Sequence, residues 1–138
     1  MPLSWEAIQS NAVTFSKRWK DARNEKSEAQ SFVRDFLAVF GVNDAAVVGR
    51  FEEQIQRESG LAFMDYFWPG KIAVEMKSKG KNLKKAYSQL KDYVLHLPAE
   101  VIPGLMMVSD FENIVLYRRT TGNPSTQCGL CHCSLRVV

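Results

Sequence analysis

The sequence has no long apolar run, no disulfide framework and no internal repeat. No stretch approaches the roughly 20 consecutive apolar residues that cross a bilayer, and the N-terminus lacks the charged and apolar pattern of a signal peptide. The three cysteines all lie near the C-terminus, so disulfide bonds cannot hold the fold together. We therefore expect a soluble, cytoplasmic protein without a membrane partner, folded as one domain over residues 1–118.

Composition and charge are ordinary for a globular domain. Of 138 residues, 46% are hydrophobic and 24% are charged, which suits a packed core and argues against global disorder. The formal net charge is +3 and the pI is about 8.8. This mild basic excess indicates no partner by itself, so the placement of the charges along the chain has to be considered.

Three segments have the apolar spacing of amphipathic helices. Ser4 is a suitable N-cap for the first, and Gly41 is placed to end the second, which begins near Ser27. Asn82 can cap the third, which runs to about Leu95. The apolar side chains recur at three- and four-residue steps: Trp5, Ile8, Ala12, Phe15 and Trp19 in the first, Phe32, Val33, Phe36, Leu37 and Phe40 in the second, and Leu83, Ala86, Tyr87, Leu90, Tyr93 and Val94 in the third.

The remaining apolar segments are typical of short strands separated by turns. The first two strands are separated by a turn at 57–60, and the order becomes α-α-β-β-β-α-β-β. This order predicts an α/β fold with a mixed central sheet flanked by helices. Strands are predicted at Val47–Ile55, on either side of Pro69-Gly70, at Leu105–Val108 and at Ile114–Tyr117.

The hairpin from Leu61 to Lys77 carries an unusual set of charges. Its first strand holds Asp65 among bulky apolar residues, and Pro69-Gly70 forms the turn. In the second strand the side chains alternate, so Glu75 and Lys77 share one face, about 7 Å apart. Charges in so apolar a hairpin are costly unless they have partners or bind a metal.

Asp65, Glu75 and Lys77 together suit metal-assisted attack on a phosphodiester. Two carboxylates from neighbouring strands can hold Mg²⁺, a hard cation that prefers oxygen ligands, and Mn²⁺ is expected to substitute for it. The metal makes its bound water more acidic, and Lys77 can orient that water and stabilise charge on phosphorus. Glu28 can add a third carboxylate. The alternative is a solvated strand face with weak ion pairs, and for Glu28 a helix-start acid.

A lysine-rich segment follows directly. No acid occurs between Lys77 and Lys91, so this segment can neutralise DNA phosphates. The alternative is a helix face that is basic for solubility. Gln89 lies one helical turn before Tyr93, and it can donate to a phosphate or to a metal-bound water, whereas Tyr93 is expected in the core. The lysines predicted to bind DNA are Lys79, Lys81, Lys84, Lys85 and Lys91.

These residues resemble a known family. Asp65 with Glu75-Met76-Lys77 is similar to the PD-(D/E)xK nuclease superfamily, with Met64 in place of the proline, and Gln89-x-x-x-Tyr93 is similar to its RecB-like branch. Longer matches resemble the N-terminal endonuclease domain of MmeI-like restriction–modification proteins over about Leu3 to Tyr117. They are LSWEAI, EKSEAQSF, FGV, DYFWPG, VEMKS, KKAYSQLKDY and LMMVSDF.

The resemblance implies a restriction-endonuclease-like core and Mg²⁺-dependent cleavage of DNA that leaves a 5′-phosphate. It implies that Asp65 and Glu75 bind metal and that Lys77 is the catalytic lysine, with Glu28 and Gln89 assisting. Such nucleases are normally fused to a methyltransferase and a target-recognition domain. Neither is expected here, since no glycine-rich cofactor motif occurs and Asn123-Pro124-Ser125-Thr126 lacks the aromatic residue of the methyltransferase motif. A homodimer is open, because many restriction nucleases cut as pairs.

Two other functions stay open beside the endonuclease. The same fold can serve as a DNA-binding or assembly module with little cleavage of its own. It can also be a repair or junction-resolving nuclease, which would prefer DNA ends or branches.

The segment 119–138 has no convincing period and is expected to be a flexible or non-native tail. It contains Cys128, Cys131, His132 and Cys133, which match the c-type haem attachment pattern and are also possible zinc ligands. No export signal supports haem, and three consecutive ligands make one tetrahedral zinc site awkward. The favoured interpretation is a tail with reactive thiols.

Overall fold

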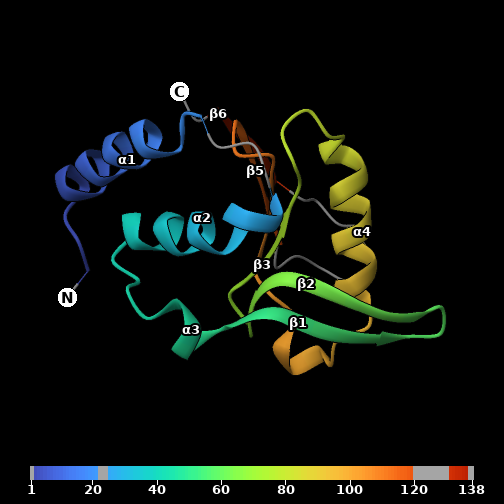
Figure 1. The fold of residues 1–138 in the computed structure, drawn as a ribbon. Coiled ribbons are helices and arrows are strands. Elements are labelled where there is room, and N and C mark those ends of the chain that lie inside the picture. Colours follow the sequence, from blue (N-terminus) through green and yellow to red (C-terminus); the bar gives the residue numbers. More distant parts are fainter. Residues whose placement is uncertain (1, 22–24, 120–130, 137–138) are drawn as a thin grey trace.

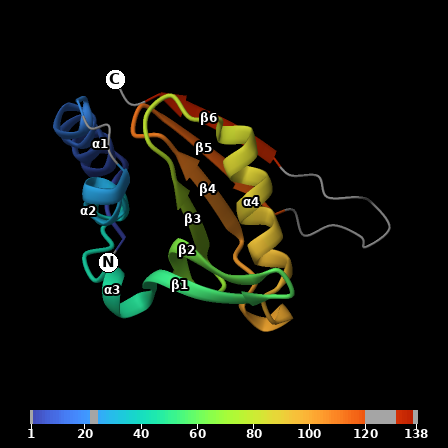
Figure 2. The same cartoon turned by 45° about the vertical axis from the view of Figure 1, so that its right-hand side comes forward.

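The computed structural model describes residues 2–21, 25–119 and 131–136. Its centre is a six-stranded sheet with the strands in sequence order, antiparallel except for the parallel pair β3–β4. Helices α1, α2 and α3 lie on one face and α4 on the other (Figures 1 and 2). The predicted α/β class with a mixed sheet flanked by helices is therefore confirmed. No helix in these ranges is long and apolar enough to cross a membrane.

The bounds of the elements follow the predictions closely in the middle of the chain. The helices are α1 (Trp5–Trp19), α2 (Glu25–Val39), α3 (Ala45–Val48) and α4 (Leu83–Leu95), with a 3-10 turn η1 (Ala99–Val101). The strands are β1 (Arg50–Arg57), β2 (Gly60–Trp68), β3 (Ile72–Met76), β4 (Leu105–Ser109), β5 (Asn113–Arg118) and β6 (Cys131–Arg136).

The predicted helix ends are confirmed by hydrogen bonds. The Ser4 hydroxyl accepts from the Ala7 amide at 3.1 Å, and the Asn82 side chain accepts from two amides at the start of α4. Gly41 ends α2 in the left-handed region, at φ 90°, where glycine costs least. Two members of the predicted apolar stripes lie outside the core: Trp5 is 68% exposed, and Phe40 lies beyond the end of α2 and is 51% exposed.

The strand predicted to begin at Val47 is also wrong, because Val47 and Val48 belong to the short helix α3 and β1 begins at Arg50. The reason is a tertiary contact. The buried Tyr66 hydroxyl donates to the Ala45 carbonyl at 2.8 Å, and a side chain at Gly49 would overlap the same tyrosine ring. Burial raises the pKa of Tyr66 above its usual value, with Asp44 adding to the effect and Arg34 opposing it, so the hydroxyl remains a donor at neutral pH.

Two apolar cores lie on the two faces of the sheet. In β3, Ile72, Val74 and Met76 pack toward α1 and α2, while Ala73 packs toward α4. This confirms the predicted alternation, and it assigns the odd-numbered face of β3, which carries Glu75, to the α4 side.

The C-terminal segment adds a strand that the sequence analysis did not predict. β6 pairs antiparallel with β5, from Asn113↔Arg136 to Arg118↔Cys131. β6 lies within the segment 119–138, which the sequence analysis expected to be a flexible or non-native tail, and the boundary at residue 118 therefore leaves out one strand of the sheet. The haem and zinc hypotheses concern side chains outside the described residues.

Candidate active site

Asp65 and Glu75 meet where β2 separates from β3. The paired residues of these strands end at Tyr66↔Val74, and the register extended by one residue places Asp65 opposite Glu75. Directly opposite residues of an antiparallel pair share a face. Beyond the last pair, the Asp65 carboxylate accepts a hydrogen bond from the Met76 amide at 2.6 Å. The two carboxylates therefore come from adjacent strands at the end of β3.

A kink in β1 accompanies this separation. Glu52 has φ 53°, in the left-handed region that side chains seldom adopt. It lies between the pairs Phe51↔Tyr66 and Glu53↔Met64, so it stands opposite Asp65. The outer part of the β1–β2 hairpin bends away from the sheet and passes beside α4 (Figure 2). Beyond this bend β2 no longer pairs with β3, whose last residue paired to β2 is Val74.

Lys77 connects the Glu75 carboxylate to α4. Glu75 is only 5% exposed, and its Oε1 lies 3.3 Å from the Lys77 Nζ. The same Nζ donates to Gln89 Oε1 at 2.9 Å, and Gln89 Nε2 donates to the hydroxyl of Tyr93. A buried carboxylate needs such compensation, because burial of an unpaired charge is costly. The structure thus brings together Glu75, Lys77 and Gln89 as the sequence predicted, with Asp65 beside them.

Tyr93 is in the core, as expected, but it also has a polar role that the sequence did not reveal. Its hydroxyl holds Gln89, and the Arg57 guanidinium lies 5.0 Å above its ring. Arg57 also pairs with Asp92 at 3.2 Å. The sequence offered no signal for this support, because Arg57 stands at a strand end far away along the chain.

Glu28 is placed differently from the other predicted ligands. It lies in the first turns of α2, which packs on the face of the sheet opposite α4. Among the described residues, no three Asp, Glu, His or Cys side chains lie close enough together to hold a metal ion. The structure does not unite Glu28 with Asp65 and Glu75 in such a group, and its role as a metal ligand stays a prediction.

The donor chemistry at the end of β3 nevertheless suits a hard cation. Asp65 and Glu75 are both carboxylates, one of them buried, and Mg²⁺ binds to one or two carboxylates while keeping several waters. Two protein carboxylates are therefore a sufficient set.

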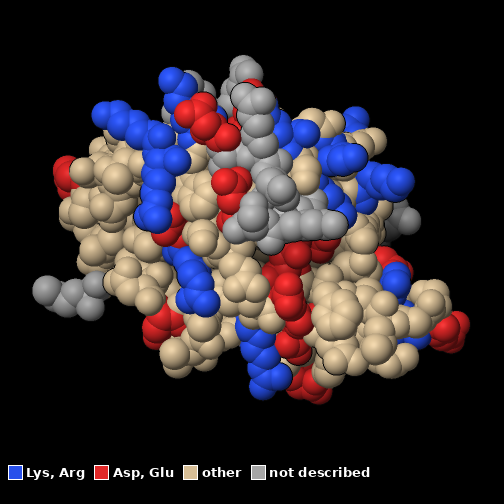
Figure 3. Space-filling model, in the orientation of Figure 1, with Lys and Arg blue, Asp and Glu red and all other residues tan. Residues whose placement is uncertain are grey.

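The structure separates the predicted DNA-binding lysines into groups. A pocket of about 400 Å³ beside the carboxylates is lined by Lys77, Lys81, Asn82, Lys85, Ala86 and Gln89. Lys79 points elsewhere, with its Nζ 3.8 Å from a Glu112 carboxylate oxygen. Lys84 and Lys91 are exposed and do not line the pocket. Figure 3 shows Lys and Arg side chains gathered near the upper end of α4, above a band of acidic side chains.

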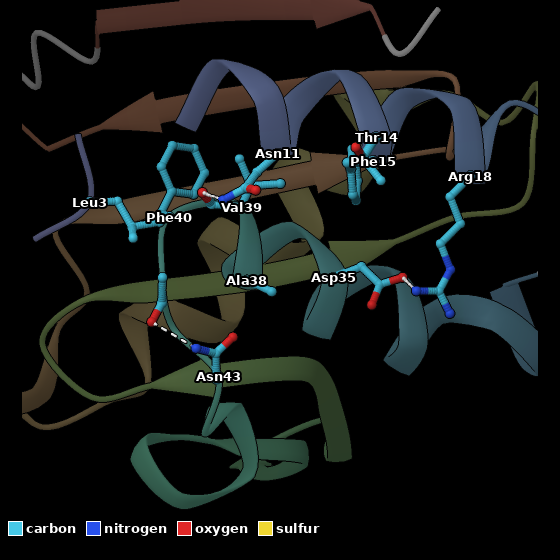
Figure 4. A pocket seen from close by; sticks show the side chains of 11 residues that line it. Leu3, Asn11, Thr14, Phe15, Arg18, Asp35, Ala38, Val39, Phe40 and Asn43 are labelled. Carbon is cyan, nitrogen blue, oxygen red and sulfur yellow. Dashed lines mark hydrogen bonds and ion pairs between the residues drawn. The ribbon is translucent and has the colours of Figure 1, made fainter. Parts of the chain in front are cut away.

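A larger hollow of about 600 Å³ lies between α1 and α2 and is separate from this site. Figure 4 shows that several of its polar side chains already have partners: Arg18 pairs with Asp35 at 3.1 Å, and the Asn11 side chain donates to the Val39 carbonyl at 3.2 Å. It belongs to the helical layer on the other face of the sheet. The candidate active site is therefore the smaller, basic pocket.

A mixed sheet between helical layers, with Asp65 within β2 and Glu75-x-Lys77 at the end of the adjacent β3, is compatible with a restriction-endonuclease-like core. The chain belongs to the family of MmeI N-terminal domains, whose family model matches residues 10–135. No curated protein and no solved structure matches the chain. The family associates the chain with restriction–modification. Its match extends through most of β6, so the expectation that the resemblance ends near Tyr117 was wrong.

Proposed function

We propose that this chain is the Mg²⁺-dependent endonuclease domain of a restriction–modification system and hydrolyses DNA phosphodiesters. The observation that carries the proposal is the convergence of Asp65, Glu75, Lys77 and Gln89 from β2, β3 and α4 beside one basic pocket. A surface ion pair alone would not need a buried glutamate and a hydrogen-bonded partner on another element.

The roles of the residues follow from their contacts. A Mg²⁺ ion held by Asp65 and Glu75 would supply Lewis acidity at the phosphate and a more acidic water. Lys77 stands next to Glu75, so its ammonium group can orient the attacking water and stabilise negative charge developing on the phosphate. Gln89 fixes the Lys77 side chain by accepting one of its hydrogen bonds. Mn²⁺, which also prefers oxygen ligands, is expected to replace Mg²⁺.

The lysines beside the site supply affinity for the DNA backbone, and binding should weaken as the salt concentration rises. In this proposal, associated methyltransferase and specificity domains recognise the DNA sequence. Two copies of the chain together cleave both DNA strands. Glu28 would act as a third metal ligand only if its carboxylate reached Asp65 and Glu75. Its helix, α2, packs on the face of the sheet opposite α4.

The test is plasmid cleavage across a Mg²⁺ and Mn²⁺ titration by the parent and by Asp65→Asn. We expect nicked and linear DNA from the parent, and a loss of at least about 100-fold in the variant. Glu58→Gln, which alters an exposed carboxylate in the β1–β2 turn, is the matched control and should cut normally. Equal cleavage by Asp65→Asn contradicts the proposal.

Two other outcomes favour the alternatives. A parent that binds DNA but never cuts it with either metal indicates a binding or assembly module. A preference for branched or broken DNA over intact plasmid indicates a repair or junction-resolving nuclease.

A further inference from the structure

The six lysines from 77 to 91 do not form one continuous surface. An α-helix turns by about 100° per residue, so Lys85 and Gln89 lie on one flank of α4. Lys84 and Lys91, seven residues apart, lie together on the opposite flank. The buried stripe of Ala86, Leu90, Tyr93 and Val94 separates the two flanks.

One flank faces the candidate active site and the other does not. Lys81 and Lys85 line the same pocket as Lys77 and Gln89, and no carboxylate lines it. Lys77 is partly neutralised by Glu75, whereas Lys81 and Lys85 form no ion pair within the described part of the chain. The pocket therefore carries uncompensated positive charge next to the proposed scissile phosphate.

The first amides of α4 are already satisfied. The Asn82 side chain accepts from the Lys84 amide at 3.0 Å and from the Lys85 amide at 3.2 Å. An anion in the pocket would therefore be held by lysine side chains and by Gln89 rather than by the helix end. Ammonium groups on flexible stems suit a phosphate whose exact position varies with DNA sequence.

We propose that this pocket binds a backbone phosphate of the cleaved strand, next to the scissile phosphate, through Lys81 and Lys85. The inference rests on the proposed function, since Lys77 and Gln89 belong to both sites. It assigns direct phosphate contact to Lys81 and Lys85, and only a distant electrostatic contribution to Lys84 and Lys91.

The experiment compares two double variants that remove the same charge from the same helix region. Lys81→Gln/Lys85→Gln removes the pocket lysines, and Lys84→Gln/Lys91→Gln is the matched control. All four side chains are exposed, so neither variant should change the melting temperature appreciably. Binding of a short mixed-sequence DNA duplex is measured in EDTA over a range of salt concentrations.

Each lysine that contacts a phosphate adds about one to the slope of log affinity against log salt. The pocket variant should lose about two from this slope and bind at least about tenfold more weakly, while the control keeps the parent slope. Equal slopes for the two variants, a larger loss in the control, or no DNA binding by the parent would each overturn the pocket proposal.

Failure of the pocket and failure of the endonuclease proposal give different results. If the parent never cuts but the slope falls only in the Lys81/Lys85 variant, Lys81 and Lys85 bind a backbone phosphate, and the endonuclease proposal falls together with the assignment of that phosphate to a cleaved strand. If the parent cuts with Mg²⁺ and both variants have equal slopes, the endonuclease proposal stands and the pocket falls.

Discussion

The Lys77 ammonium donates to the Gln89 carboxamide across the space between β3 and α4, with 2.9 Å between Nζ and Oε1. This contact joins a strand end to a helix and fixes a side chain with four rotatable bonds. Because Nζ also lies 3.3 Å from a Glu75 oxygen, the ammonium group is held between the carboxylate and the amide. We regard Lys77 as the centre of the site and Gln89 as the residue that positions it.

Replacement of Gln89 by alanine should lower the rate of DNA cleavage about 10- to 100-fold, the usual effect of losing a supporting contact. Affinity for DNA should change less than the rate, because the lysines remain. Tyr93→Phe, which removes only the hydroxyl that holds Gln89, should have a smaller effect in the same direction. Single-turnover cleavage measures the rate, and Ser88→Ala, an exposed neighbour, is the control. A normal rate in Gln89→Ala contradicts the positioning role.

Lys77→Met should destabilise the protein when no metal is bound. It removes the cation that faces the buried Glu75 carboxylate, and we expect the free energy of unfolding to fall by about 1–3 kcal/mol. Urea denaturation in EDTA measures the change. Lys84→Met on the exposed flank of α4 should stay within about 0.5 kcal/mol of the parent. Equal stability of Lys77→Met and the parent would show that Glu75 does not depend on this lysine.

Addition of Mg²⁺ should stabilise the parent, because a ligand that binds only the folded state raises its stability. At one hundred times the dissociation constant the gain is about 2.7 kcal/mol. The melting temperature should therefore rise with Mg²⁺ concentration in the parent and stay constant in Asp65→Asn and Glu75→Gln. A similar rise in all three proteins would place the bound Mg²⁺ at another site.

Gly49→Ala should be strongly destabilising although glycine is often replaceable. The added Cβ would meet the Tyr66 ring and the Phe67 carbonyl, so we expect a loss of about 1–3 kcal/mol in the free energy of unfolding. Gly104→Ala is the matched control, since its Cβ would find only ordinary contacts. Thermal and urea unfolding of the two variants compare them directly. Equal stability would mean that Tyr66 can move without cost.

The parts of the fold that the sequence predicted depend on short-range chemistry. Pro69-Gly70 predicted the hairpin turn, and the alternation from Ile72 to Met76 predicted which side chains lie on each face of β3. Asn82 predicted the start of α4. The hairpin then brings Asp65 to Glu75 without help from the rest of the chain. These features could be inferred because each needs only neighbouring residues.

The parts that the sequence did not reveal depend on contacts between distant segments. Val47 and Val48 suit a strand, but the Tyr66 hydrogen bond to Ala45 and the contact at Gly49 place them in α3. The segment of β6 alternates Cys131, Cys133 and Leu135 with His132, Ser134 and Arg136, a two-residue period that the sequence analysis missed. The strand itself is formed by pairing with β5. Which flank of α4 faces the pocket became clear only once the helix was placed against β3.

The most direct test of the site is the position of a bound divalent cation. Crystals of the protein grown with Mn²⁺ and measured at the manganese absorption edge locate the ion by its anomalous signal. We predict one Mn²⁺ whose ligands include carboxylate oxygens of both Asp65 and Glu75, each within roughly 2.5 Å. An ion bound elsewhere, or carboxylates that turn away from one another and leave no shared ion, would contradict the account.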